Sequence, residues 1–185
     1  AWSFVSLLRS NGWEVAHTEL ALEGHFGEIP VRGKADVVLR RDDELAIVDL
    51  KWSGATRRKE LIQNGEDLQL VLYAKMLPPP EQWPHTAYFI LEEGKMIARN
   101  PAAFKEAIVA GKGGDDHAAA CEAIFQKMEK TLAWRMEQIR RGVLELRTGR
   151  TAPELEALYE GQLFDLLEMK TEDARWDDYR ALLGV

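Results

Sequence analysis

One stretch of the chain, residues 31–51, constrains the fold more than any other. It holds two strand-like runs, 35–39 and 45–50, on either side of a short polar segment. We therefore expect a β-hairpin whose turn is centred between Asp42 and Asp43. Asp-Asp is not one of the favoured hairpin dipeptides, so a register shifted by a one-residue bulge stays open as the alternative.

This register would place two carboxylates and an amine on one wall of the hairpin. Asp36 would face Asp49, and Lys34 would face Lys51, with opposed Cβ atoms roughly 5 Å apart. Asp49 and Lys51 are two residues apart and share a face, whereas Leu50 points into apolar packing. Carboxylates this close repel each other, and either a divalent cation between them or a shifted pKa on one would relieve the repulsion.

Length and composition indicate one domain, or one domain with an appendage, because the chain has 185 residues of which 46% are hydrophobic. The sequence contains no run of about 18 apolar residues, so no transmembrane helix is expected, and no signal peptide is visible. The single cysteine, Cys121, excludes an intramolecular disulfide and any four-cysteine metal site, which fits the cytoplasm. The chain begins at Ala1 without a methionine, so we expect a piece of a larger protein.

The net charge of −7 by itself argues against a nucleic-acid partner, but the charge is unevenly distributed. Acidic residues dominate residues 151–185, whereas residues 31–75 are nearly balanced. Just past the hairpin, Arg57, Arg58 and Lys59 form a compact basic cluster of the kind that binds phosphates. The alternative is an ordinary solvated helix start.

The pattern of apolar residues predicts a mixed α/β structure with helices packed on a central sheet. Strands are expected at 13–22, 35–39, 45–50, 85–91 and 95–99, with a turn at 24–30. Helices are expected at 2–10, 58–77, 101–109, 116–146, 151–169 and 176–183. In the second of these helices Gln69 and Tyr73 are four residues apart and share a face. A partly exposed polar residue is the alternative reading of Gln69.

Four motif pieces follow one another in order between residues 13 and 92. They are Gly33-x-x-Asp36, Asp49-x-Lys51, Trp52-Ser53-Gly54 and Gln69-x-x-x-Tyr73. Together they resemble the PD-(D/E)XK nuclease superfamily, and more narrowly the nuclease domains of bacterial recombination helicase–nucleases of the RecB and AddB type and their Cas4-like relatives. Two further acid-x-Lys tripeptides, at Glu93 and Glu168, lie in a turn and on a helix and lack this context.

The resemblance implies a restriction-endonuclease-like fold, with a mixed central sheet flanked by helices and an additional C-terminal helical region. We expect a nuclease core at residues 1–110 and a helical extension at 111–185 that packs on it.

The resemblance also assigns roles to the site residues. Asp36, Asp49 and the main-chain carbonyl of Leu50 would bind Mg²⁺ or Mn²⁺, and Lys51 would position or activate the attacking water. The helix motif, Gln69 and Tyr73, would contact DNA or support the active site.

The activity implied is metal-dependent hydrolysis of DNA, as an exonuclease, in a bacterial recombination and repair protein with a helicase domain or subunit before this segment. The first alternative is a catalytically weakened or inactive nuclease-like module for DNA binding or complex assembly. The second is an α/β domain whose polar hairpin residues form a structural ion pair.

The chain departs from the family pattern in two places. Many members carry a metal-binding histidine on a helix upstream of the first strand, but the helix expected here has none, and His17 and His25 fall in or near strands. Relatives with an iron–sulfur cluster carry cysteines near the C-terminus, and no cluster is expected here. The residues at those cysteine positions are Ala174, Asp177 and Leu183.

Overall fold

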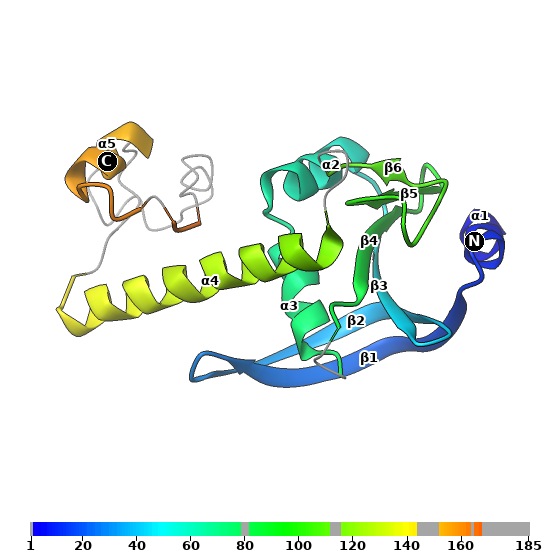
Figure 1. Cartoon of the computed structure of the whole chain (residues 1–185), viewed down its shortest axis with the longest axis horizontal. Helices are drawn as coiled ribbons and strands as arrows, with labels where there is room; N and C mark the ends of the chain where they lie inside the picture. The colour runs from blue at the N-terminus through cyan, green and yellow to red at the C-terminus, as the bar shows by residue number, and fades with distance from the viewer. Residues whose placement is uncertain (1, 79–81, 112–115, 144–151, 164, 168–185) are drawn as a thin grey trace. The chain divides into compact units, whose positions relative to one another are not determined.

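The computed structural model describes residues 2–78, 82–111, 116–143, 152–163 and 165–167. Its centre is a six-stranded mixed sheet with the strands in sequence order (Figure 1). The strands are β1 (Glu14–Phe26), β2 (Ile29–Arg41), β3 (Glu44–Lys51), β4 (His85–Ile90), β5 (Lys95–Ala98) and β6 (Ile108–Val109). Neighbouring strands are antiparallel except for β3–β4 and β5–β6, which are parallel. The expected mixed sheet flanked by helices is confirmed.

The described helices are α1 (Trp2–Ser10), α2 (Ala55–Asn64), α3 (Leu68–Met76), α4 (His117–Arg140) and α5 (Ala152–Leu158). The chain forms two compact units, Ala1–Phe125 and Gln126–Val185, and α4 begins in the first and ends in the second. Within the second unit Trp134 stacks edge-on against Tyr159, with ring centroids 5.0 Å apart. The expected domains at 1–110 and 111–185 stay a prediction. No helix in the described part of the chain is long and apolar enough to cross a membrane.

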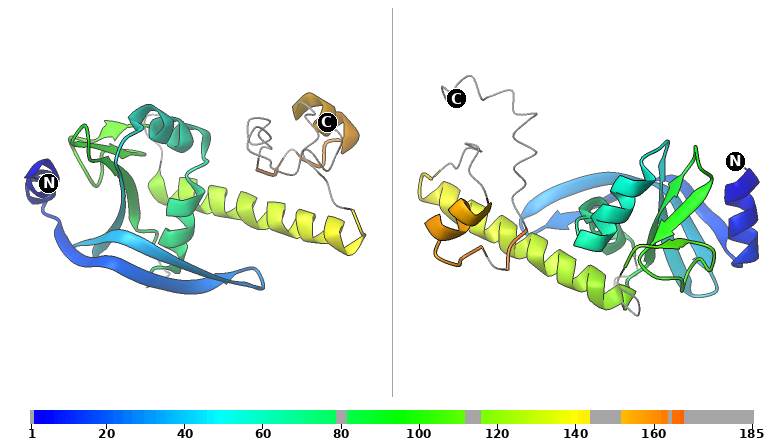
Figure 2. Two further views of the ribbon diagram at one scale, coloured as in Figure 1. Left: turned by 180° about the vertical axis from the view of Figure 1, so that it is seen from behind. Right: turned by 90° about the horizontal axis from the view of Figure 1, so that it is seen from above.

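The sheet of the first unit is covered on both faces (Figure 2). One face packs against α1, and its buried side chains form the α1-side cluster, which includes Leu8, Trp13, Val37, Leu39, Val48, Phe89 and Phe104. The other face packs against α2 and α3 in the α2/α3-side cluster, which includes Ala35, Val38, Ile47, Ile62, Leu70, Tyr88 and Ile97. Strands buried on both faces explain the nearly continuous apolar runs in β3 and β4.

The β2–β3 hairpin has the predicted register, from Arg41 opposite Glu44 to Val37 opposite Val48. Asp42 takes a left-handed conformation, with φ of 51°, which lets a two-residue turn join the strands. The ladder ends at Val37–Val48, however, so the expected pairings of the residues beyond it do not form. Lys34, expected opposite Lys51, instead makes an ion pair with Glu19 on β1.

The hairpin ladder ends there because β2 changes face at Asp36. Residues two apart in a regular strand share a face, yet Ala35 belongs to the α2/α3-side cluster and Val37 to the α1-side cluster. The β1–β2 pairing skips Asp36 together with Glu19, whose φ is 54°. Because of this irregularity, the Asp36 side chain does not follow the regular alternation of side chains along the strand, and its direction changes.

The single helix expected at 58–77 is two helices, α2 and α3. Gly65, with φ of 67°, ends α2 in a left-handed conformation, and the amide of Glu66 donates to the carbonyl of Leu61 at 2.7 Å. This is the hydrogen-bond pattern of a glycine-terminated helix. The sequence contains the Asn64-Gly65 stop signal, but the apolar positions continue across it and conceal the break.

Three other boundaries differ from expectation. The turn expected at 24–30 is only Gly27 and Glu28, because β1 and β2 pair as far as Phe26 and Ile29. The long helix ends at Arg140 rather than near residue 146, and α5 ends at Leu158 rather than near 169. The expected helix at 176–183 and the C-terminal cysteine positions lie outside the described residues.

The segment 101–109 is not the expected helix but a loop that leads into β6. Its main chain is hydrogen-bonded to side chains of the short connection between α1 and β1. The indole nitrogen of Trp13 donates to the carbonyl of Ala103 at 2.7 Å, and the amide of Lys105 donates to the side-chain oxygen of Asn11 at 2.9 Å. These long-range partners replace the hydrogen bonds that a helix would form.

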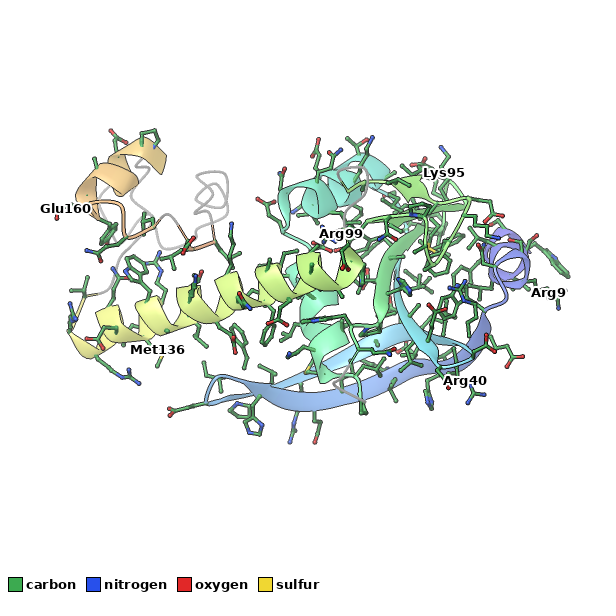
Figure 3. All side chains as sticks on the ribbon, viewed as in Figure 1. Arg9, Arg40, Lys95, Arg99, Met136 and Glu160 are labelled. Atoms are coloured by element: carbon green, nitrogen blue, oxygen red, sulfur yellow. The ribbon has the colours of Figure 1, made fainter. Side chains whose placement is uncertain are left out.

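A buried ion pair ties the end of the sheet to the break between α2 and α3. Arg99 donates to both carboxylate oxygens of Asp67 at 2.9 Å, and to the carbonyl of Ile62 at 3.2 Å. Both charged side chains are buried, 5% and 1% exposed. In Figure 3 Arg99 lies in the interior near α2, whereas Lys95 at the other end of β5 lies at the surface.

We predict that Asp67→Asn lowers the free energy of unfolding by roughly 3–5 kcal/mol, because it leaves the Arg99 guanidinium buried without its counter-charge. Urea unfolding would measure this. Glu93→Gln is the control: the pair of Glu93 with Lys95 is partly exposed, and its loss should cost about 1 kcal/mol or less. Equal losses in the two variants would contradict the prediction.

His117, in the first turn of α4, is buried in the first unit. Its Nε2 atom lies 2.8 Å from the carbonyl oxygen of Pro84, and its ring centroid lies 5.3 Å from that of His85. Burial lowers the pKa of His117 to about 4. The folded protein therefore keeps this imidazole neutral at pH values where the unfolded chain protonates it.

We predict that acid destabilises the protein through His117. The stability that the neutral imidazole contributes is complete above pH 6.5 and is lost as pH falls to about 4, which amounts to about 3 kcal/mol. His117→Gln should remove this part of the pH dependence, and His25→Gln, at an exposed residue, should leave it unchanged. Urea unfolding at pH 7 and pH 4.5 measures the change in the free energy of unfolding. The same pH dependence in wild type and His117→Gln would refute the role of His117.

Candidate active site

Asp49 and Lys51 lie at the carboxyl end of β3 on one face, as predicted. Asp49 is buried, 4% exposed, at a position where only a paired charge is tolerated. The Lys51 ammonium lies 3.0 Å from Oδ1 of Asp49 and 2.8 Å from Oδ2. Only the contact with Oδ1 has hydrogen-bond geometry, so the buried Oδ2 atom has no hydrogen-bond donor.

Asp36, on β2, contacts the end of β3, but not through the cross-strand pairing with Asp49 that was expected. Its Oδ2 atom accepts a hydrogen bond from the main-chain amide of Leu50 at 2.8 Å. The Leu50 side chain packs against the α1-side cluster, as expected. The expected cross-strand pair of Asp36 and Asp49 is therefore replaced by a contact between a side chain and the main chain, just past the end of the ladder.

The main-chain carbonyl of Leu50 points to the same side as Asp36. The amide and carbonyl of one strand residue point to the same edge, and successive residues alternate edges. The Leu50 amide points toward Asp36 on β2, whereas the Lys51 carbonyl accepts from the amide of Leu91, beyond the end of β4, at 2.8 Å. The Asp36 carboxylate and this carbonyl therefore lie on the same side of β3, where β2 and β3 separate.

The electrostatics of Asp49 reflect this crowding. Burial raises the pKa of Asp49, and the hydrogen bond and charge of Lys51 oppose that shift. The carboxylate of Asp36 adds to the increase in pKa, and the guanidinium of Arg58 reduces it. A conflict between two neighbouring carboxylates is expected from the sequence, and in the structure it falls on Asp49.

The donor atoms at this point fit a hard divalent cation. All are oxygens, and the buried Oδ2 atom of Asp49 receives no hydrogen bond, although the Lys51 ammonium lies close to it. Mg²⁺ is commonly held by one or two carboxylates and completes its shell with water and substrate phosphates. Among the described residues no group of three or more His, Cys, Asp or Glu side chains is placed to hold a metal. His17 and His25 are exposed on β1.

The helix motif lies on α3, which packs against the same sheet face as Asp49. The Gln69 amide donates to the hydroxyl of Tyr73 at 3.1 Å, so the two share a face as predicted. Within the described part of the chain, no hydrogen bond or ion pair joins Gln69 or Tyr73 to Asp36, Asp49 or Lys51. The structure thus places the motif on the α2/α3 side of the sheet without joining it to the acidic pair.

Gly33 and Tyr73 belong to different motif pieces and are in contact. A Cβ atom at Gly33 would lie 3.0 Å from Cζ of Tyr73 and closer still to the ring edge. Only a residue without a side chain allows the phenol ring to cross β2 here. Gly33 therefore fixes the position of Tyr73, and through it the position of Gln69.

The basic cluster does not form one patch, because successive helix residues point in different directions. Arg57 is exposed, whereas Arg58 turns inward, with its guanidinium carbon 5.4 Å from the centroid of the Tyr88 ring. The Nε atom of Arg58 is buried without a hydrogen-bond partner. Arg58 is thus the member of the cluster that acts on Asp49.

Sequence reasoning missed Tyr88. This residue pairs with Asp49 across the parallel β3–β4 ladder and is buried. Burial raises the pKa of its hydroxyl, with the carboxylates of Asp67 and Asp49 adding to the shift. The Tyr88 hydroxyl therefore stays protonated. No local signal in the sequence reveals which residue of β4 lies beside Asp49, because the parallel register depends on the whole crossover.

The family model described as the PD-(D/E)XK nuclease superfamily matches residues 4–153, which is well over half of the chain. The match includes the motif region that suggested the family from sequence. No curated protein matches the chain.

We predict that Gly33→Ala lowers the free energy of unfolding by roughly 1–3 kcal/mol, because the new methyl group would displace the Tyr73 ring. Tyr73→Ala removes the obstacle, so adding Gly33→Ala to it should cost much less. Thermal or urea unfolding of wild type, the two single variants and the double variant would give the interaction energy of this double-mutant cycle. Additive losses would show that Gly33 is not held small by Tyr73.

Proposed function

This chain belongs to the PD-(D/E)XK nuclease superfamily, and from that membership we propose that it is a metal-dependent deoxyribonuclease that hydrolyses phosphodiester bonds. One observation carries the proposal: at the end of β3 the Asp36 carboxylate is held by the Leu50 amide, and the buried Asp49 carboxylate is paired with the amine of Lys51.

Asp36, Asp49 and the Leu50 carbonyl would hold Mg²⁺ or Mn²⁺, the ions that suit a set of oxygen ligands. When bound, such an ion supplies Lewis acidity toward water and stabilises negative charge on the phosphate. The hydrogen bond from Leu50 to Asp36 fixes one carboxylate in place before any ion arrives. Such preorganisation lowers the cost of assembling the site.

Lys51 has two roles in this proposal. Its ammonium lies against Asp49 and keeps that buried carboxylate charged, which a cation ligand requires. Its side chain is partly exposed, 27%, so the ammonium can also reach substrate. There it would orient the attacking water or offset the charge that develops on the phosphate.

The remaining residues of the site would hold DNA. Arg57 is exposed and can follow the phosphate backbone, whereas Arg58 lies closer to Asp49 and can contact the phosphate that is cleaved. Gln69 and Tyr73 would contact the strand or support the α3 face of the site.

The order and spacing of the four motif pieces support a narrower proposal. The chain would act as an exonuclease in a bacterial recombination and repair protein, in the cytoplasm, with a helicase domain or subunit as its partner. The acid-x-Lys piece in its strand context, with the helix motif after it, is the feature shared with that group.

A second candidate is a nuclease-like module that binds DNA or assembles a complex without cleaving. One observation favours it: the ammonium of Lys51 already neutralises Asp49, and the described residues contribute no third carboxylate or imidazole to the site. Cleavage assays separate the two candidates directly.

We predict that Asp49→Asn and Lys51→Ala each lower DNA cleavage at least about 100-fold in Mg²⁺ or Mn²⁺, because the first removes a proposed metal ligand and the second removes the amine that would act on the water or the phosphate. Chelation of divalent ions by EDTA should abolish cleavage by the wild-type protein. Release of labelled nucleotides from linear and closed circular DNA measures the rates, and an exonuclease should degrade only the linear form.

The second acid-x-Lys tripeptide provides matched controls. Glu93→Gln and Lys95→Ala change the same residue types at a surface ion pair and should keep wild-type cleavage. Circular dichroism and melting temperatures would show whether the Asp49 and Lys51 variants stay folded. Wild-type cleavage by a folded Lys51→Ala protein would disprove the catalytic assignment.

A further inference from the structure

Trp52, the residue after the proposed catalytic lysine in the sequence, has a large apolar side chain that is exposed to solvent. It follows Lys51 at the end of β3 and is 71% exposed. By contrast Trp13 is buried in the α1-side cluster. A lone exposed apolar residue is ordinary, but an exposed aromatic ring beside a catalytic group can hold substrate.

The main chain holds Trp52 firmly in place. The amide of Glu92 donates to the carbonyl of Trp52 at 3.0 Å, in the bend that follows β3. The amide of Leu91 donates to Lys51 in the same way, and the Leu91 side chain is also exposed, 41%. Two exposed apolar residues, Trp52 and Leu91, thus have their main chains held at the carboxyl ends of β3 and β4, and we call this pair the Trp52 ledge.

The chain next to the ledge leaves room and carries positive charge. A Cβ atom added at Gly54 would meet nothing within 4 Å, so the space beside this turn is open. Residues 52–59 contain three cationic side chains and no acidic one. Arg57 is the exposed member at the start of α2. An aromatic surface beside an open, cationic segment matches the two halves of a nucleotide, its base and its phosphate.

We propose that the Trp52 ledge stacks an unpaired base of the DNA strand next to the phosphodiester that is cleaved, and so selects single-stranded DNA and frayed ends. Bases inside a duplex already stack on one another and offer no free face to the indole. Stacking on an aromatic ring tolerates any base, so the ledge reads strandedness and not sequence. This inference rests on the proposed function for the identity of the strand.

The experiment compares Trp52→Ala, Trp52→Phe and the control Trp2→Ala. Trp2, at the start of α1, is also exposed, 81%, so the control removes the same indole far along the chain. Fluorescence anisotropy in EDTA would measure the binding of a labelled oligothymidylate and of a blunt duplex without cleavage. Melting temperatures should stay at the wild-type value, because both indoles are exposed.

We expect Trp52→Ala to weaken oligothymidylate binding about tenfold, with Trp52→Phe within about threefold of wild type, since phenylalanine keeps a stacking ring. Duplex binding should change in none of the variants, and Trp2→Ala should match wild type throughout. Unchanged oligothymidylate binding by Trp52→Ala, or equal losses for oligothymidylate and duplex, would overturn the inference.

Failure of this inference and failure of the proposed function give different results. A wild-type protein that cleaves DNA, with a Trp52→Ala variant that binds oligothymidylate normally, would refute the ledge and leave the nuclease intact. A wild-type protein that cleaves no DNA, but whose oligothymidylate binding depends on Trp52, would support the ledge as a nucleic-acid contact and refute the catalytic proposal.

Discussion

The burial of the Asp49 carboxylate is the constraint on which the site depends. Asp49 is buried, and the nearby charge of Asp36 makes its ionised form still less favourable. The structure limits this conflict with two contacts: Lys51 on Asp49, and the Leu50 amide on Asp36. The Oδ2 atom of Asp49 lies 2.8 Å from the Lys51 ammonium but receives no hydrogen bond. Natural proteins tend to keep such a buried, incompletely hydrogen-bonded charge where function requires it.

The rest of the first unit holds these groups at a fixed distance from α2 and α3. Arg99 and Asp67 fasten the break between the two helices to the end of β5, and Gly33 lets the Tyr73 ring lie against β2. Because a buried charge pair contributes little net stability but is costly to break, such a pair specifies one arrangement. The orientation of α3, and with it the Gln69–Tyr73 pair, therefore depends on residues distant from it in the sequence.

The sequence predicted local features well, because alternation and spacing are local. The hairpin register, the common face of Asp49 and Lys51, and the Gln69–Tyr73 pair could all be derived from residue spacing. Features set by distant contacts were missed. The face change at Asp36 depends on Glu19 of another strand, and the partnership of Tyr88 with Asp49 depends on a parallel crossover. The loop at 101–109 was taken for a helix because its partners, Asn11 and Trp13, lie far away in the sequence.

The change of face at Asp36 divides β2 into two parts with different tolerance to insertion. Residues before it belong to a long arm that ends in the turn at Gly27, so lengthening the arm by paired additions at its tip shifts nothing at the acidic centre. Residues after it, up to Asp42, set the phase of the inner hairpin. Deletion of one residue there would invert the strand, so that Val37 and Val38 would exchange sheet faces and lose their places in the two buried clusters. Natural length variation in relatives should therefore collect in the outer arm.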